Sequence, residues 1–404
     1  MSAPALPHRR SRGRAARAAA IAVLAFAAAP PATGSADIPR DFWGVVPISD
    51  LSSAEIEQMG AGNVGSLRQL TLWPEIEPVP NEFDWTYTDF LVANAAHQAI
   101  EILPFLYGTP SWVKGIDCHG LNAELCQRVP PLAPKAQAAW ADFLRTIAAR
   151  YGTQGSFWSD TSDAYDPPYQ PITEWQIWNE PSSQTYYRPR PNARGYAKLV
   201  KISHDAITEV DPEAEIVLAG VYPAPEGGPR YRIKPYMSDF FRVRGIGKHF
   251  DSAAVHPYAR TVKSLGKQIK NVRGAMRRGG AAKKPLWISE IGWGSAPPGD
   301  DRPLVKGEQG QRDLLMESFE LLAAQRSAWK LAGVLWYSWR DPSYGYPNCT
   351  FCSSAGLLTA DGDPKPAWHA FVDITHGQAE PPSPSEPSPP PEDPAPPPIP
   401  PTLP

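Results

Sequence analysis

Short apolar segments that alternate with helical stripes are the feature that most restricts how this chain can fold. Residues 134–151 and 192–210, together with two later segments, place apolar side chains at helical spacing. Between such helical segments lie eight runs with the length and composition of buried strands, at residues 42–48, 64–73, 100–108, 172–179, 215–222, 250–258, 285–293 and 331–339. Strands that alternate with helices in this way form parallel sheets.

The number of strands suits a closed barrel. The predicted fold is therefore α/β, a (β/α)8 TIM barrel that forms a single catalytic domain over residues 37–377. A doubly wound open sheet is the alternative, but such sheets usually carry a glycine-rich phosphate loop after an early strand, and the sequence has none. In a barrel the chemistry lies at the carboxyl ends of the strands, so strand-end residues are the candidates for a functional site.

The two ends of the chain differ from this middle part. Residues 1–36 contain several arginines, then the apolar run IAVLAFAAA, then small residues, and this order is typical of a secretory signal peptide. The apolar run is too short for a stable membrane anchor, so we expect a secreted, extracellular protein without a membrane partner. Residues 378–404 are rich in proline and nearly devoid of large apolar side chains, which predicts a disordered, polyproline-like tail.

The net charge and the cysteines restrict the expected partners and the expected redox compartment. The formal net charge of −3 gives no general reason to expect nucleic acid as a partner. Cys118 and Cys126 lie in one expected loop, and Cys349 and Cys352 lie in another. Two local disulfides in an oxidising compartment are the simplest interpretation, although four cysteines permit three pairings. A zinc site made of all four cysteines and a redox-active Cys-x-x-Cys pair are the weaker alternatives.

Glutamates end two of the expected strands. Glu180 follows the fourth strand in WQIWNEP, and Glu290 lies near the end of the seventh in LWISEIGWGS. A single glutamate at a strand end more often forms a salt bridge or caps a helix. Two of them on one face of a barrel, however, supply what cleavage of a glycosidic bond requires, one carboxyl to protonate the leaving oxygen and one to attack the anomeric carbon.

These segments resemble the retaining glycoside hydrolases of clan A, barrels with an acid/base glutamate in an Asn-Glu pair after strand four and a nucleophilic glutamate after strand seven. The resemblance extends over residues 40–375, and the early segment LRQLTLWPEIEPVPNEFDWTYTDFLV also resembles families 39 and 5. It implies a glycosidase that hydrolyses O-glycosyl compounds in β-linked oligo- or polysaccharides, with a carbohydrate as its partner and neither cofactor nor metal.

The resemblance also implies roles for individual residues. Glu180 would be the acid/base, Glu290 the nucleophile, and Asn179 the residue that binds the sugar 2-hydroxyl. Arg68 matches the arginine that keeps the nucleophile ionised. His256 and Tyr258 in VHPY match the pair after the sixth strand, in which the tyrosine donates to the nucleophile.

Tryptophans near strand ends are candidates for stacking on sugar rings, and collectively they fit a sugar-binding cleft. The resemblance implies that Trp336 or Trp339 stacks on the sugar in the central subsite, and Trp112, in the loop after the third strand, is a further candidate. Any single tryptophan can equally be a core residue. A metal role for His256 is not indicated, because no second histidine or acidic residue stands at ligand spacing.

Several alternatives stay open. An exo-acting β-xylosidase competes with an endo-acting β-glucanase or mannanase, and residues 109–133 would favour exo action if they closed a pocket. A non-catalytic glycan-binding barrel would usually have lost Glu180, Glu290 or Arg68. A metal-dependent hydrolase would carry clustered histidines and aspartates at the strand ends, which the sequence does not show.

Overall fold

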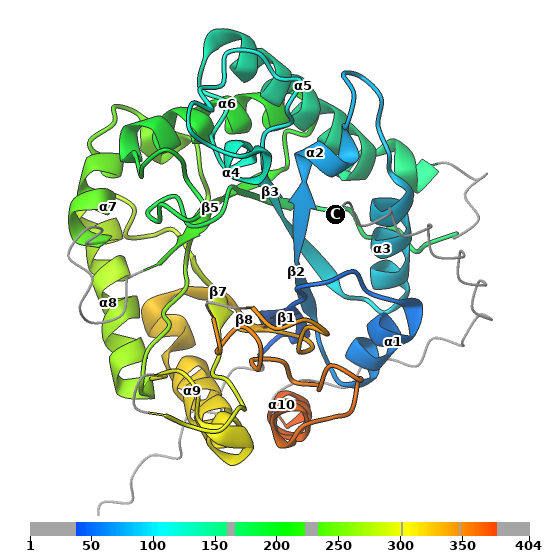
Figure 1. The fold of residues 1–404 in the computed structure, drawn as a ribbon, viewed down its shortest axis with the longest axis vertical. Helices are drawn as coiled ribbons and strands as arrows, with labels where there is room; N and C mark the ends of the chain where they lie inside the picture. Colours follow the sequence, from blue (N-terminus) through cyan, green and yellow to red (C-terminus); the bar gives the residue numbers. More distant parts are fainter. Residues whose placement is uncertain (1–37, 160–165, 223–232, 300–301, 347–348, 378–404) are drawn as a thin grey trace, which may run out of the picture. The chain divides into compact units, whose positions relative to one another are not determined.

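The structure, a computed structural model, describes residues 38–159, 166–222, 233–299, 302–346 and 349–377 (Figure 1). The expected signal peptide at residues 1–36 and the expected proline-rich tail at residues 378–404 lie outside these residues. Among the helices of the described part, none combines the length and the apolar character that a membrane span requires.

Eight parallel strands close into a barrel in the order in which they occur along the chain, which confirms the predicted TIM barrel. The strands are β1 (Trp43–Val46), β2 (Ser66–Leu72), β3 (Glu101–Tyr107), β4 (Glu174–Ile177), β5 (Glu215–Val221), β6 (Ser252–Val255), β7 (Leu286–Ile291) and β8 (Leu331–Tyr337). β8 pairs with β1 from Trp43 opposite Val334 to Val46 opposite Tyr337, and this pairing closes the ring.

Helices surround the strands, as Figure 1 shows. They are α1 (Ser53–Ala61), α2 (Trp73–Ile76), α3 (Thr86–His97), α4 (Ala123–Gln127), α5 (Pro134–Tyr151), α6 (Ala193–Val210), α7 (Ile233–Phe241), α8 (Val262–Arg278), α9 (Gly307–Trp329) and α10 (Pro366–His376), with the short 3-10 helices η1 (Arg40–Phe42), η2 (Ser156–Ser159) and η3 (Ile246–Lys248). α5 begins at Pro134, as predicted, because a proline in the first turn lacks only an amide that needs no helical partner. Asn192 caps α6 by accepting a hydrogen bond from the Gly195 amide.

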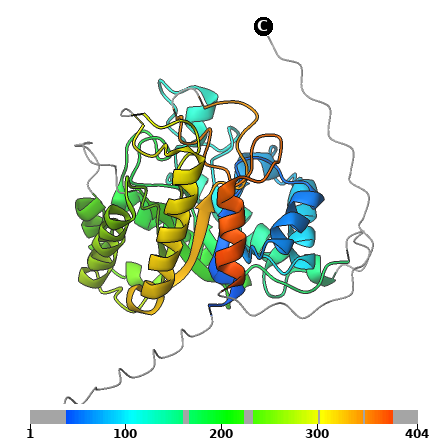
Figure 2. The same ribbon diagram turned by 90° about the horizontal axis from the view of Figure 1, so that it is seen from below.

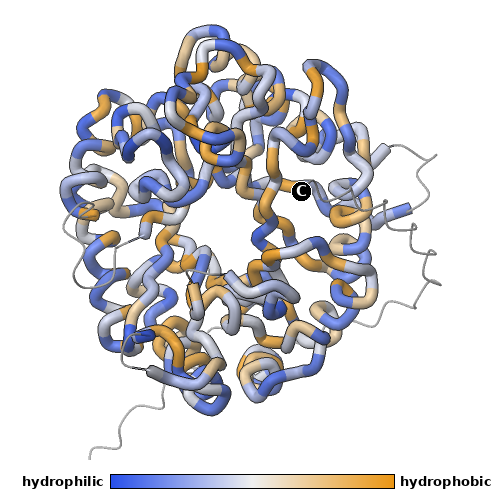
Figure 3. Tube along the Cα trace, viewed as in Figure 1, coloured by the Kyte–Doolittle hydropathy of each residue, from blue (hydrophilic) through white to orange (hydrophobic). Residues whose placement is uncertain are grey.

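Buried side chains form two layers, because successive residues of a strand point to opposite faces. Residues from six different strands contact one another across the barrel interior, namely Val46, Leu103, Val217, Ala254, Trp287 and Leu335. A larger cluster fills the space between the strands and the helices. In Figure 3 the strand segments around the centre are mainly orange, whereas blue residues recur along the outer sides of the helices. Core side chains therefore cover both faces of the strands.

Figure 2 shows the barrel from the side, with the long segments that follow β3 and β8 gathered at the carboxyl ends of the strands. Both of these segments carry a disulfide, Cys118–Cys126 in the first and Cys349–Cys352 in the second. The prediction of two local disulfides is thus confirmed.

Candidate active site

The chain leaves β4 through a strained turn. β4 ends at Ile177, earlier than predicted, because Trp178 and Glu180 have positive φ angles of 73° and 35°. The Trp178 amide donates to the Leu106 carbonyl at 2.9 Å, and its indole Nε1 donates to the Tyr186 carbonyl at 2.8 Å. Non-glycine residues keep such angles only where their surroundings impose them, and these positions concentrate at functional sites. The turn directs Asn179 and Glu180 toward the barrel axis.

Arg68 on β2 joins three strands through its guanidinium. Its Nη1 donates to Glu290 Oε1 at 2.7 Å, its Nη2 to Asn179 Oδ1 at 2.9 Å, and its Nε to Gln176 Oε1 at 2.6 Å. The group is fully buried and lies 3.9 Å from the centre of the Phe105 ring. A buried cation is tolerated only with such partners, so the arginine and its acceptors hold each other in place.

Glu290, on β7, receives a hydrogen bond on each carboxylate oxygen. Arg68 donates to Oε1, and the Tyr258 hydroxyl donates to Oε2 at 2.7 Å. Burial raises the pKa of Glu290, and the positive charge of Arg68 together with the Tyr258 hydrogen bond counteracts that rise. Both donors stabilise the ionised carboxylate and fix its plane.

Glu180 lies in a different electrostatic setting. Burial, followed by the negative charge of Glu290, raises its pKa well above the ordinary value for a glutamate, and Arg68 only counteracts this. Of the two carboxyl groups, Glu180 is therefore the one that holds its proton more tightly. One carboxyl oxygen of Glu180 and one of Glu290 lie within 4.8 Å of each other. Their side chains are 10% and 11% exposed, so both are accessible from the open end of the barrel.

His256, which follows β6, lies between the two glutamates. Its Nδ1 is 2.8 Å from Glu180 Oε1 and 3.4 Å from Glu290 Oε2, and its Nε2 is 3.1 Å from Ser289 Oγ. Burial and then the charge of Arg68 lower the pKa of His256 well below its ordinary value, which favours a neutral ring. Gly220 on β5 makes room for this ring, because a Cβ atom there would lie 1.9 Å from Nε2.

Glu180, His256 and Glu290 are also a geometric candidate for a metal site. The sequence does not indicate this group, because Glu180 and Glu290 belong to other strand ends than His256 and are far from it along the chain. The donor set nevertheless fits proton transfer better than a metal. Both oxygens of Glu290 already accept hydrogen bonds from Arg68 and Tyr258, and a guanidinium at this distance repels a second cation.

The structure corrects the expectation for the eighth strand. Trp336 is fully buried outside the barrel near Trp293 and Phe319, and its Nε1 donates to the Ala355 carbonyl at 3.0 Å. Because side chains alternate along a strand, the next residue, Tyr337, packs instead with the side chains of the barrel interior. Tyr337 is thus the β8 residue that faces the barrel mouth, and Trp336 is not placed to stack on a sugar.

Trp339 and Trp112 also make structural contacts. Trp339 is 1% exposed, donates to Glu55 Oε1 at 3.1 Å and packs edge-on against Trp368 of α10. Trp112 is half-buried, and its Nε1 donates to the Glu77 carbonyl at 2.9 Å. The prediction of a stacking role for Trp339 is corrected in the same way as that for Trp336, whereas the role of Trp112 stays a prediction.

Tyrosines surround the carboxylate pair where tryptophans were expected. Burial raises the pKa of Tyr186, Tyr222 and Tyr337. In each case the negative charge of Glu180 or Glu290 is the second-largest cause of the rise. The sequence carried a signal for two of them, because Tyr222 is the last residue of the apolar run that becomes β5 and Tyr337 lies near the end of the run that becomes β8. Tyr186 lies in the irregular segment after β4, where periodicity gives no such signal.

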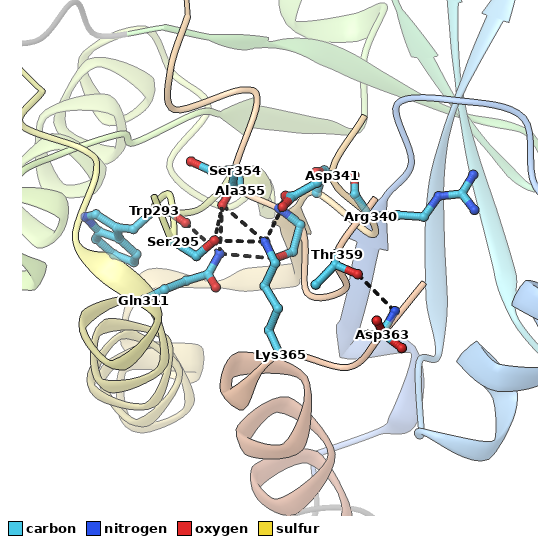
Figure 4. Close-up of polar contacts among 12 residues, drawn as sticks. Trp293, Ser295, Gln311, Arg340, Asp341, Ser354, Ala355, Thr359, Asp363 and Lys365 are labelled. Carbon is cyan, nitrogen blue, oxygen red and sulfur yellow. Dashed lines mark hydrogen bonds and ion pairs between the residues drawn. The ribbon is translucent and has the colours of Figure 1, made fainter. Parts of the chain in front are cut away.

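A buried ion pair fixes the segment after β8, as Figure 4 shows. Lys365, 3% exposed, donates through Nζ to Asp341 Oδ2 at 2.5 Å and to Ser295 Oγ at 2.9 Å. The Gly356 amide donates to the other oxygen of Asp341 at 2.8 Å. The segment held in this way includes Phe351, whose ring centre lies 5.1 Å from that of Tyr258. The segment that the ion pair holds therefore packs, through Phe351, against the tyrosine that donates to Glu290.

Comparison with known proteins assigns the family. Residues 163–365, half of the chain, match the family described as glycosyl hydrolase catalytic core. The chain belongs to this family. The expected relationship and the expected glycosidase class are thereby confirmed. Among curated proteins, none matches the chain in sequence.

Solved structures share the fold at low sequence identity. The glycosyl hydrolase core is similar to a family 39 glycoside hydrolase from Bacteroides cellulosilyticus, with a TM-score of 0.59 and 19% identity, and the match covers 83% of this chain and 63% of that one. A GH5_18 protein from Streptomyces cattleya in complex with GlcNAc has a TM-score of 0.60 and 18% identity, over 87% and 83% of the two chains. A monomeric β-xylosidase from Caulobacter crescentus has a TM-score of 0.57 and 17% identity, over 84% and 68%.

Proposed function

We propose that this protein is a secreted glycoside hydrolase that cleaves β-glycosidic bonds with retention of configuration, with Glu180 as acid/base and Glu290 as nucleophile. The observation that carries the proposal is the short gap between the two carboxyl groups, whose nearest oxygens lie within 4.8 Å. Retaining enzymes keep their carboxyl groups about 5–5.5 Å apart, whereas inverting enzymes leave about 6.5–9.5 Å for a water molecule. An approach of two oxygens to within 4.8 Å favours the shorter separation of the groups.

The first step forms a covalent intermediate. The ionised carboxylate of Glu290, oriented by Arg68 and Tyr258, attacks the anomeric carbon as the bond from that carbon to the leaving oxygen breaks. Glu180 gives its proton to the leaving oxygen, and the raised pKa of this group supports that role. Asn179, whose Oδ1 accepts a hydrogen bond from Arg68, would bind the sugar 2-hydroxyl.

The second step releases the sugar. Esterification of Glu290 removes its negative charge, which is the second cause of the high pKa of Glu180. The pKa of Glu180 therefore falls, and its carboxylate takes a proton from water while the water oxygen attacks the anomeric carbon. Glu290 leaves as a carboxylate, and the next proton that Glu180 donates is the one it has just received.

A β-linked glycan is the proposed substrate, in line with the β-xylosidase among the structures of similar fold. Secretion is supported by the order of arginines, apolar run and small residues in 1–36 and by the two disulfides. The same disulfides hold the segments after β3 and β8, which border the open end of the barrel.

The test combines a panel of aryl β-glycosides with β-linked polysaccharides. Wild type should hydrolyse one sugar class, and NMR should detect the β-anomer as the first product. Glu290→Ala should lose turnover on every substrate, whereas Glu180→Ala should lose it mainly on substrates with poor leaving groups, because good leaving groups need no acid.

Glu101→Gln, at the opposite end of β3, is the matched control and should behave as wild type. An α-anomer as first product would exclude retention. Binding of glycan without turnover by wild type would show that the barrel is not an enzyme.

A further inference from the structure

Two histidines and an aspartate meet outside the barrel, away from the carboxylate pair. His204 and Asp205 lie on α6, and His249 directly follows η3. One nitrogen of each histidine and one oxygen of Asp205 lie within 4.8 Å of one another. His204 Nδ1 is 3.0 Å from Asp205 Oδ1, and His249 Nε2 is 3.9 Å from the same oxygen.

Hydrogen bonding selects the nitrogen that His249 offers to this group. Its Nδ1 lies 2.9 Å from the Gly245 carbonyl oxygen, which can only accept a hydrogen bond, so the ring proton is on Nδ1. In the neutral ring Nε2 then carries the lone pair, on the side of Asp205. Histidines that bind metals commonly use this arrangement, in which a backbone carbonyl fixes the tautomer and the ring orientation.

The spacing of the three atoms is near that of a zinc site. Tetrahedral Zn²⁺ with bonds of about 2.0–2.1 Å has ligand atoms roughly 3.3 Å apart. Side-chain movements of less than about 1 Å would bring this group to that spacing. Such movements are available, because His204 and His249 are 26% and 23% exposed and Asp205 is 69% exposed. Solvent would supply the fourth ligand.

The backbones that carry the ligands are already joined. Lys201 of α6 donates through Nζ to the carbonyl of Arg244 at 2.7 Å, next to the turn at Gly245. The rings of His204 and His249 also pack edge to face, with their centres 4.9 Å apart. Binding an ion here would therefore order a few side chains and no backbone segment, which lowers the entropic cost.

We infer that His204, Asp205 and His249 form a site for a transition-metal ion of the Zn²⁺ class that fastens α6 to the segment before β6. The position indicates a structural role. α6 ends just before β5 begins, and His249 lies three residues before β6, so the site is at the amino end of the strands, opposite Glu180 and Glu290. Residues on that face of a barrel serve stability rather than catalysis.

The test measures binding of Zn²⁺ by calorimetry and of Co²⁺ by its visible absorption, with full-length protein freed of any polyhistidine tag. Wild type should bind one equivalent with a tetrahedral Co²⁺ spectrum. His204→Ala and His249→Ala should each weaken binding by about 100-fold or more, and Asp205→Asn by less, because an amide oxygen is a poorer ligand. His369→Ala, an exposed histidine on α10, is the matched control and should bind as wild type.

Thermal unfolding provides the second readout. Free zinc about 100-fold above its Kd should raise Tm by roughly 4 °C in wild type and His369→Ala, and leave the Tm of His204→Ala unchanged. Hydrolytic activity should be the same with and without zinc. The inference fails if His204→Ala and His249→Ala bind zinc like wild type, if wild type binds none, or if Glu290→Gln alone abolishes binding, since that result would place the ion between the two glutamates.

Discussion

Removal of the Tyr258 hydroxyl tests the electrostatic account of the carboxylate pair. Tyr258→Phe keeps the ring against Phe351 and deletes only the 2.7 Å hydrogen bond to Glu290 Oε2. A hydrogen bond to a charged group contributes about 1.5–3 kcal/mol, which corresponds to about a 10- to 150-fold loss of kcat/KM if it stabilises the ionised nucleophile that the reaction requires.

The sign of the pH effect follows from which form the hydroxyl stabilises. Tyr258 donates to the carboxylate, so it counteracts the burial that raises the pKa of Glu290. Without the hydroxyl the pKa of Glu290 rises, and a larger fraction of the enzyme carries a protonated, inactive nucleophile at low pH. The acidic limb of the kcat/KM profile should therefore move to higher pH, with the largest loss below neutral pH.

The assay is the pH dependence of kcat/KM on an aryl β-glycoside with a good leaving group, for which protonation by Glu180 matters little. Tyr337→Phe is the control, because it removes a tyrosine hydroxyl from the same barrel mouth and leaves the Glu290 hydrogen bond intact. An acidic limb that stays in place in Tyr258→Phe, or that moves equally in Tyr337→Phe, would refute the reasoning.

Three further predictions concern the scaffold. Lys365→Met should lower the free energy of unfolding, measured by urea denaturation, by about 3–5 kcal/mol, because it leaves Asp341 buried without its cation. The double variant Lys365→Met/Asp341→Asn should be more stable than Lys365→Met alone. A less stable double variant would contradict this. Burial raises the pKa of Glu174 to about 7, so the stability that this group contributes is present below its unfolded pKa and is lost as pH rises through 7. Glu174→Gln should therefore stabilise the protein by on the order of 2 kcal/mol at pH 8 relative to its effect at pH 5, and equal effects at both would count against a buried neutral carboxyl. Trp336→Phe should lower stability by about 1–3 kcal/mol and leave KM unchanged, since the ring packs against the helix layer; a large rise in KM would return Trp336 to the substrate cleft.

Local patterns were sufficient to predict the architecture. Apolar runs of strand length and stripes of helical spacing depend on a few neighbouring residues, and a closed barrel is the arrangement that buries eight such runs under their helices. The disulfides were predictable for a similar reason, because Cys118 and Cys126 are close in sequence, as are Cys349 and Cys352.

The sequence did not determine on which face of the sheet a given strand residue lies. A change of one position in a strand moves a side chain from one side of the sheet to the other. Trp336 and Tyr337 both lie near the end of the eighth apolar run, and only the pairing of β8 with β1 and β7 directs Tyr337 inward. The expectation that Trp336 stacks on a sugar failed for this reason.

By itself, the sequence determined the barrel and the strand ends at which Glu180 and Glu290 lie, because these features follow from periodicity and from local motifs. The tertiary structure decided what surrounds each carboxyl group. The contacts of Glu290 with Arg68 and of His256 with Glu180 join residues 222 and 76 positions apart, and no local pattern encodes them. Burial and these long-range contacts make one glutamate retain its proton more tightly than the other, since a pKa depends on neighbours in space rather than in sequence.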